Sequence, residues 1–256
     1  MDFLISASTD AGTRKATNQD SLFVSRLLTC RGKMVFAVLC DGMGGMEKGE
    51  LASATLVKAF CTWAKERLQT LQEREIADAD IRAQWEDIIF RQNEKIIAYG
   101  VQNGILLGTT VTAMLLTEKR YYILNVGDSR AYEITDALAQ LTQDQTVVAR
   151  EVALGNLTSE EAEKDSRRNV LLQCVGIKED VCPEMYFGDT KPDAVYMLCS
   201  DGFRHEISPQ EFVAYYEPAC MTGEDVLRAQ SEHLIALNKQ RNEKDNISVI
   251  TVKVCC

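Results

Sequence analysis

AVLCDGMGGMEKGE, residues 37–50, places an aspartate and then three glycines directly after the end of an apolar run. The run, residues 34–41, is almost continuously apolar, which is typical of a strand buried on both faces or in a sandwich core. Such a strand would carry the carboxylate of Asp41 rigidly to the edge of the core. The glycines allow a tight turn and a close approach of the backbone to a ligand or ion. Taken alone, DGMGG is equally compatible with an ordinary turn.

The composition indicates one soluble globular chain. Its 256 residues are 46% hydrophobic and contain no linker-like stretch, so we expect a single domain over residues 1–256. The N-terminus, MDFLISASTDAG, is acidic and too short in apolar length for a signal peptide. No apolar run approaches the roughly 18 residues of a membrane span. The predicted location is therefore the cytoplasm, with no membrane partner.

Charge, cysteine and histidine content narrow the function classes. The net charge of -10 argues against a uniform basic face, so we expect no nucleic-acid partner. Nine cysteines at irregular spacing favour reduced thiols that pack as small hydrophobic groups over a disulfide framework or a zinc site. The only two histidines, His205 and His233, give little support to a His-rich metal centre or a serine-protease triad.

Hydrophobic periodicity predicts an α+β fold with two antiparallel sheets. Strands are predicted over residues 3–12, 20–28, 34–41, 108–118, 120–129, 130–136, 185–190, 194–201 and 246–254. Amphipathic helices are predicted over residues 48–73, 80–102, 208–216 and 223–240. Residues 136–140 are expected to form a hairpin turn, and the polar segment 142–170 contains the capping-type start TSEE. A two-sheet sandwich flanked by helices would use all of these elements.

Four further aspartates share the position of Asp41 at the end of a predicted strand. Each lies beside a glycine or asparagine or in a polar turn, and the four are Asp20, Asp128, Asp201 and Asp245. One such aspartate is explained by turn structure, but five together are not. If the five converge, their mutual repulsion requires a cation. Ligand sets made only of oxygen select hard metal ions, here Mg²⁺ or Mn²⁺ ahead of Ca²⁺.

Eight motifs resemble, in order along the chain, the protein phosphatase 2C family of metal-dependent Ser/Thr phosphatases. They are RKATNQD (14–20), DGMGG (41–45), LGTT (107–110), VGDSRAY (126–132), LTQDQT (141–146), RRNVLLQCVG (167–176), CSDG (199–202) and DN (245–246). The resemblance covers residues 8 to 252, so it implies that the chain is one phosphatase catalytic domain of bacterial type. It implies a four-layer α-β-β-α sandwich, in which helix pairs flank two central antiparallel sheets.

The resemblance also implies a two-metal centre. Asp41 would bridge two Mn²⁺ or Mg²⁺ ions, and the Gly42 carbonyl would bind one of them. Asp201 and Asp245 would complete the coordination of one ion. Asp20 would hold the other ion, largely through water. These residues would therefore be the metal ligands of the site.

Catalysis by the family implies roles for two further residues. Asp128 matches the position that binds a third, weaker ion together with Asp201. Arg14 matches the arginine that binds the substrate phosphate, a task that suits a bidentate guanidinium. The expected reaction is attack on phosphorus by a metal-activated water, with Asp41, Arg14 and Asp201 as the catalytic residues and no covalent intermediate.

The chain departs from the family pattern at four positions. Gln19 stands where the family often has Glu, and we expect it to tune the waters of the centre. Met43 replaces the histidine that animal members carry as a proposed general acid, and Gln145 replaces a frequent histidine. His205 follows the SDG turn, where we expect it to have a surface role.

Two other functions compete with this hypothesis. Residues 61–67, CTWAKER, have the Cys-x5-Arg spacing of a cysteine phosphatase, but they lie in a predicted helix and lack glycine. The stronger alternative is a catalytically silent pseudophosphatase that binds phosphoproteins as a regulatory module. As an enzyme, the chain is expected to be a monomer whose partners are phosphorylated Ser/Thr proteins and a separate Ser/Thr protein kinase. An anti-sigma antagonist is an alternative substrate within the same reaction.

Overall fold

The computed structural model describes residues 1–29, 32–44, 48–68 and 77–255. Within these residues, two five-stranded sheets have the strand orders β1-β12-β11-β8-β9 and β10-β7-β6-β3-β2. The first sheet consists of β1 (Asp2–Asp10), β12 (Ile247–Cys255), β11 (Val195–Cys199), β8 (Arg130–Ile134) and β9 (Leu138–Gln140). The second consists of β10 (Glu184–Asp189), β7 (Arg120–Val126), β6 (Val111–Thr117), β3 (Gly32–Cys40) and β2 (Ser21–Thr29). All neighbouring strands are antiparallel.

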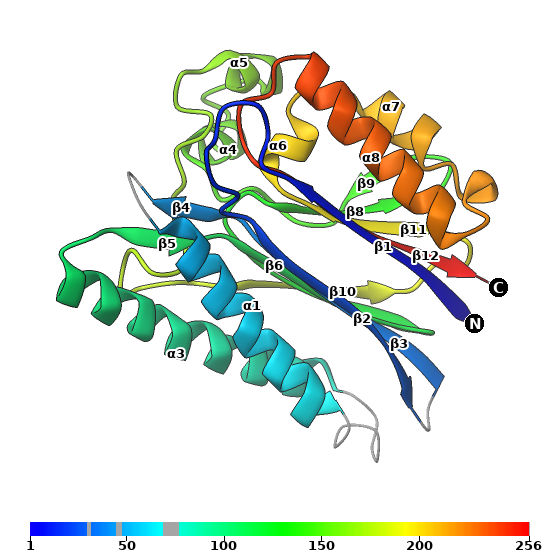
Figure 1. Ribbon diagram of the computed structural model, residues 1–256, viewed down its shortest axis with the longest axis horizontal. Coiled ribbons are helices and arrows are strands. Elements are labelled where there is room, and N and C mark those ends of the chain that lie inside the picture. Colours follow the sequence, from blue (N-terminus) through cyan, green and yellow to red (C-terminus); the bar gives the residue numbers. More distant parts are fainter. Residues whose placement is uncertain (30–31, 45–47, 69–76, 256) are drawn as a thin grey trace.

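Helices cover the outer face of each sheet, so the predicted α-β-β-α architecture is confirmed (Figure 1). The long helices α1 (Gly49–Glu66) and α3 (Asp78–Asn103) pack on the second sheet. The first sheet is covered by α6 (Asp201–Arg204), α7 (Pro209–Tyr215) and α8 (Glu224–Gln240). The remaining elements are the helices α4 (Val147–Ala153) and α5 (Ser159–Lys164), the 3₁₀ turn η1 (Pro218–Cys220), and the short strands β4 (Gly42–Gly44) and β5 (Leu107–Thr109).

Strand β3 is buried on both faces, as its nearly continuous apolar run predicts. Its even-numbered residues from 34 to 40 pack under α1 and α3. Its odd-numbered residues from 35 to 39 pack between the two sheets, against residues of β11 and β12. Side chains alternate across a strand, so this one segment belongs to two of the three interfaces between layers. This packing on both faces holds the C-terminal end of β3 in place, directly before Asp41.

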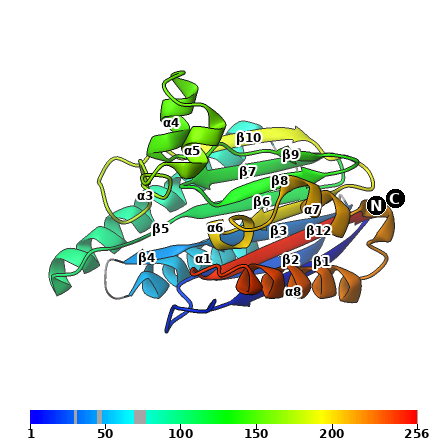
Figure 2. The same ribbon diagram turned by 90° about the horizontal axis from the view of Figure 1, so that it is seen from above.

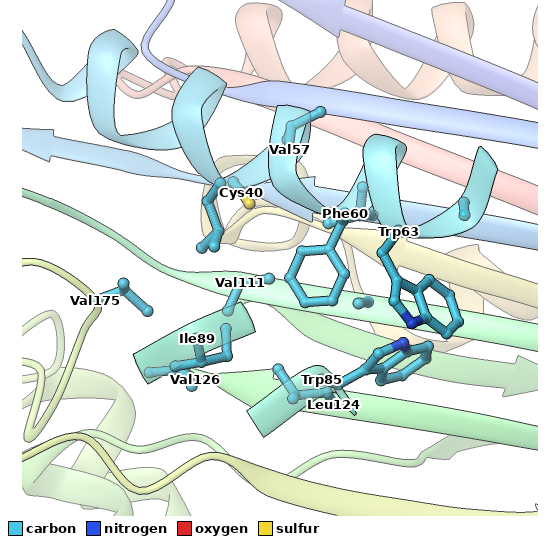
Figure 3. Close-up of a cluster of buried hydrophobic side chains, with 14 of the residues drawn as sticks. Cys40, Val57, Phe60, Trp63, Trp85, Ile89, Val111, Leu124, Val126 and Val175 are labelled. Carbon is cyan, nitrogen blue, oxygen red and sulfur yellow. The ribbon is translucent and has the colours of Figure 1, made fainter. Parts of the chain in front are cut away.

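Aromatic side chains fill the core beneath α1 and α3 (Figure 3). Trp85 of α3 is fully buried and makes edge contacts with Phe36, Phe60 and Trp63 at centroid distances of 6.0, 5.9 and 5.4 Å. Edge-to-face pairs add to the stabilisation that burial of the rings provides. This cluster fixes both long helices on the sheet.

The predicted elements differ from the structure mainly at short segments. The predicted strand 108–118 is two strands, because Thr110 between β5 and β6 is hydrogen-bonded to Asp41 rather than continuing a single ladder. The expected hairpin turn at 136–140 contains the strand β9, paired with β8. The TSEE start is confirmed as a capping box of Thr158 and Glu161 on α5. Residues 69–73 of the predicted first helix lie outside the described residues.

No helix in the described part of the chain is long and apolar enough to cross a membrane. The seven cysteines in this part are free thiols, and Cys40 and Cys199 are buried at the ends of β3 and β11.

Replacing Phe36 by alanine tests how strongly the aromatic cluster stabilises the fold. Because its ring is fully buried between helices and sheet, we expect Phe36→Ala to lower the free energy of unfolding by about 3–5 kcal/mol. The matched control is Phe90→Ala on α3, whose side chain is 44% exposed and should cost far less. Urea unfolding followed by circular dichroism measures both. Equal losses in the two variants would contradict the assignment of the core.

Candidate metal centre

The five candidate aspartates lie at strand ends, where the fold can bring them together. Asp41 follows β3, Asp128 follows β7, and Asp201 follows β11. Asp20 directly precedes β2, and Asp245 lies two residues before β12. Strand β4 directly follows Asp41, and helix α6 begins at Asp201. In both Figure 1 and Figure 2, these two elements lie toward the end of the sandwich opposite the two termini.

The LGTT segment holds the backbone of Asp41 from both sides. The N–H of Asp41 donates to Thr110 Oγ1 at 3.0 Å. Its carbonyl accepts from the Thr110 N–H at 2.9 Å and from Thr109 Oγ1 at 2.9 Å. Thr110 Oγ1 also lies 2.9 Å from Ser129 Oγ, next to Asp128. Two motifs that are distant in the sequence therefore fix one turn.

Gly42 is required by a close approach of three backbone segments. The residue pairs with Thr109 across the short β4–β5 ladder, and its N–H donates to the Gln19 carbonyl at 3.2 Å. A Cβ atom at Gly42 would lie 2.4 Å from the Gly49 carbonyl oxygen and 2.5 Å from that of Gln19. No side chain fits there. The absence of a side chain lets the turn after β3 contact the loop that carries Asp20.

Asn246 attaches the loop at residues 11–20 to the start of β12. Its side chain is buried, accepts from the Gln19 N–H at 2.9 Å, and donates to the carbonyls of Ala11 and Thr17 at 3.0 and 3.2 Å. A Cβ at Gly202 would lie 2.2 Å from the Asn246 carbonyl oxygen. The turn after β11 therefore contacts the same segment. Asn246 positions three parts of the site without contributing a charge.

The aspartates are close enough to disfavour one another's ionisation. Burial raises the pKa of Asp41 well above its usual value, and the charges of Asp20, Asp201, Asp128 and Asp245 raise it further. Burial also raises the pKa of Asp20 to about 7, with Asp201 and Asp245 adding to the effect. The pKa of Asp128 rises to about 7 through burial and the charge of Asp201. The fold therefore gathers negative charge that needs compensation.

Several carboxylate oxygens at the site are buried without a hydrogen-bond partner. They include both side-chain oxygens of Asp20 and Oδ1 of Asp201. The hydroxyls of Ser248 and Ser200 lower the pKa of Asp20 in part, yet neither reaches hydrogen-bonding geometry with it. Buried polar atoms are almost always paired, so unpaired oxygens indicate a missing ligand. An all-oxygen donor set of this kind fits a hard divalent cation.

The carboxylates are not arranged as a closed coordination shell. In residues 1–29, 32–44, 48–68 and 77–255, no three His, Cys, Asp or Glu side chains are close enough together to hold a metal ion. The chemistry of the donors fits a cation, and binding one would require the side chains to move closer.

Lys15 is a charged residue of the site that the sequence analysis did not identify. Its Nζ lies 3.0 Å from Asp245 Oδ1. Although partial burial disfavours the ammonium form, the hydrogen bond to Asp245 and the charges of Asp41 and Asp201 raise the pKa of Lys15. Arg14 precedes it in the same loop and is exposed. In the sequence, the position of Lys15 next to Arg14, the predicted phosphate-binding residue, was the one signal that could have indicated it.

His205 is packed against the site, so the expected surface role is wrong. Its side chain is 16% exposed, with Nδ1 3.2 Å from Glu243 Oε2 and Nε2 3.6 Å from Asp201 Oδ2. Glu243 Oε1 in turn accepts from the backbone N–H groups of Lys244 and Asp245 at 2.6 and 2.8 Å. The short helix α6 directs residue 205 back toward the loop at 241–246. His205 therefore connects the segments that carry Asp201 and Asp245.

Gln145 also has a positional role. Its side-chain Oε1 accepts from the Gly127 N–H at 2.7 Å, and its backbone N–H donates to the Gly127 carbonyl at 3.0 Å. These two bonds fix the turn that presents Asp128. An amide oxygen therefore makes the side-chain contact at this position.

Comparison with known proteins identifies relatives over nearly the full length of the chain. The family model described as Protein phosphatase 2C matches residues 9–236. The serine/threonine phosphatase stp of Listeria innocua is 26% identical over 249 residues, which cover 96% of this chain and 93% of the relative. A putative protein phosphatase 2C-type of Streptococcus pyogenes is 30% identical over 252 residues, with 97% and 96% covered. The solved catalytic domain of PstP in complex with two manganese ions has a TM-score of 0.77 at 27% identity, and 99% of each chain is covered.

The family match includes the two glycine-flanked turns that follow β3 and β11, where Asp41 and Asp201 lie. The relatives extend the similarity to the Asp245–Asn246 pair and into β12. This chain therefore belongs to the protein phosphatase 2C family.

Proposed function

We propose that this chain is a metal-dependent protein phosphatase that hydrolyses phosphoserine and phosphothreonine without a covalent intermediate. The observation that carries the proposal is the gathering of carboxylates at one end of the sandwich, with buried oxygens that lack partners. Family membership and the phosphatase names of the relatives support the reaction class. Residues 1–256 act as one catalytic domain, and the enzyme works as a monomer.

Two divalent cations, Mn²⁺ or Mg²⁺, would be held by oxygen ligands from four segments. These ligands are the carboxylates of Asp20, Asp41, Asp201 and Asp245 and the carbonyl of Gly42. The manganese complex of PstP supports a pair of ions. When bound, the cations would lower the pKa of a shared water so that it can attack phosphorus near neutral pH.

The chain itself orients the reacting groups. Hydrogen bonds from Thr109 and Thr110 hold the backbone of Asp41 in place. Arg14, in the exposed loop that Asn246 attaches to β12, binds two oxygens of the substrate phosphate through its planar guanidinium. That contact places the phosphorus over the carboxylate cluster and offsets the charge that develops on the phosphoryl oxygens. Phosphorylated Ser/Thr proteins and the kinase that produces them are the partners of this reaction.

Cysteine chemistry is not needed for this mechanism. Burial raises the pKa of the Cys40 thiol well above its usual value and that of Cys199 to about 12. Cys61, in the segment with Cys-x5-Arg spacing, lies within α1, and burial raises its pKa as well. Thiols that stay protonated are poor nucleophiles. The water-based mechanism is therefore favoured over a phosphocysteine intermediate.

Mn²⁺-dependent hydrolysis tests the function directly. We expect the protein to hydrolyse p-nitrophenyl phosphate and a phosphothreonine peptide with Mn²⁺, and to be silent with EDTA. Asp41→Asn and Asp201→Asn should each reduce kcat/KM by at least about 100-fold, because each removes an ionised ligand from the centre. A parent protein that binds the phosphopeptide but shows no turnover with Mn²⁺ or Mg²⁺ would instead support the pseudophosphatase.

Asp41→Asn should also stabilise the metal-free protein. Since burial and four neighbouring carboxylates disfavour its charge, removing that charge should raise the free energy of unfolding in EDTA on the order of 1–2 kcal/mol. The control is Asp189→Asn, whose side chain is 91% exposed and should change stability by less than about 0.5 kcal/mol. Urea unfolding in EDTA gives both values. A loss of stability in Asp41→Asn would show that the carboxylate is compensated within the chain.

Arg14→Ala should weaken phosphate binding without affecting the metals. We expect kcat/KM for a phosphopeptide to fall about 10- to 100-fold, while the Mn²⁺ affinity measured by calorimetry stays unchanged. Arg91→Ala on α3, which removes an exposed ion pair with Asp87, serves as the control and should keep full activity. Unchanged kinetics in Arg14→Ala would exclude the proposed contact.

A further inference from the structure

Arg204, the last residue of α6, brings a positive charge into the metal centre beside Asp128. Its side chain is 13% exposed, and its Nη2 lies 3.7 Å from Asp128 Oδ2. The same nitrogen donates to the Asp128 carbonyl at 3.2 Å. Asp128 is itself only 8% exposed. The two opposite charges therefore face each other where little water screens them.

A second carboxylate near Arg204 already has a cation of its own. Nη2 of Arg204 lies 3.6 Å from Asp144 Oδ2. Asp144 is bound bidentately by Arg130, whose Nε and Nη2 each donate to one carboxylate oxygen at 2.7 Å. Arg130 and Asp144 thus form a complete pair. The charge of Arg204 remains to balance Asp128.

Arg204 is poorly explained as a purely structural residue. Arg130 uses all three of its nitrogens, with Nη1 donating to the Tyr132 hydroxyl at 2.8 Å. Arg204 Nε, in contrast, is buried without a hydrogen-bond partner among the described residues. A buried guanidinium with an unpaired N–H group is costly unless strong charge attraction compensates for it. The carboxylate of Asp128 provides that attraction.

We propose that Arg204 is the resident cation of Asp128, so that this residue does not bind a third divalent ion and the centre holds two. A dication on the Asp128 carboxylate would lie within a few ångströms of the guanidinium, and the like charges would repel each other. The inference rests on the two-ion phosphatase proposed above. In this chain, the guanidinium of Arg204 would take the place of the weak third metal ion beside Asp128.

Counting bound Mn²⁺ tests the inference independently of catalysis. In an equilibrium titration of the metal-free wild type, followed by the electron paramagnetic resonance signal of free Mn²⁺, we expect two ions per chain. Asp128→Asn should leave that number at two, because Asp128 is already paired with Arg204. Three ions in the wild type, with one lost in Asp128→Asn, would overturn the proposal. This comparison does not depend on any substitution of Arg204.

Removing the charge of Arg204 should open the additional site. We expect Arg204→Gln to bind a third Mn²⁺ at least about tenfold more tightly than any further Mn²⁺ bound by the wild type. Arg204→Lys keeps the charge and should stay at two ions. The matched control Arg241→Gln removes an equal charge from an exposed pair with Glu211 and should also stay at two. A third ion in Arg204→Gln should disappear again in the double variant with Asp128→Asn.

The outcomes separate this inference from the proposed function. If the wild type binds two ions and Arg204→Gln, folded by circular dichroism, also binds two, the role of Arg204 is refuted and the phosphatase stands. If the wild type binds no Mn²⁺ and hydrolyses no phosphoester, the metal centre itself is refuted, and the inference with it.

Discussion

The central constraint on this structure is that carboxylates which repel one another must be held at one end of a sandwich. The fold satisfies this constraint with hydrogen bonds between side chains and the backbone, which do not involve the carboxylates themselves. Thr110 holds Asp41, Gln145 holds the turn before Asp128, and Asn246 holds the loop before Asp20. Both side-chain oxygens of Asp20 and Oδ1 of Asp201 are buried without a hydrogen-bond partner among the described residues. The energetic cost of the site therefore falls mainly on the carboxylates, while hydrogen bonds hold the backbone segments that carry them.

The layered core offsets the free-energy cost of holding the carboxylates together. Strand β3 contributes to two interfaces at once. Strands β11 and β12 likewise pack against both the sheet that contains β3 and the helices α6 to α8. Strand ends that emerge from such layers have little freedom to move apart. Close approaches of backbone at Gly42 and Gly202 then join the ends to one another. Repulsion within the site is opposed by burial of apolar surface throughout the sandwich.

The sequence predicted the long elements and the five strand-end aspartates, because both are marked by local patterns. A nearly continuous apolar run identified β3, the period of 3.6 residues identified α1 and α3, and the abrupt end of an apolar run identified Asp41 and Asp201. The strands β4 and β9 are three residues long and carry no readable period. The contact of Lys15 with Asp245 joins residues more than 200 positions apart. This contact forms only in the folded chain, so no local pattern in the sequence indicates it.

The residues after the SDG turn bring cationic and titratable side chains to the border of the carboxylate cluster. Asp201 begins α6, and the next turn of the same helix brings Arg204 to Asp128 and His205 to Glu243. Glu243 accepts hydrogen bonds from the backbone N–H groups of Lys244 and Asp245, so it connects His205 to the loop that carries Asp245. A four-residue helix therefore connects three of the five aspartates through side chains that flank the cluster. Cations of the chain border the carboxylates at Asp128 and Asp245, whereas both oxygens of Asp20 are buried without a partner among the described residues. Asp41 is affected by the charges of four other carboxylates, so a metal ion would gain the most at Asp20 and Asp41.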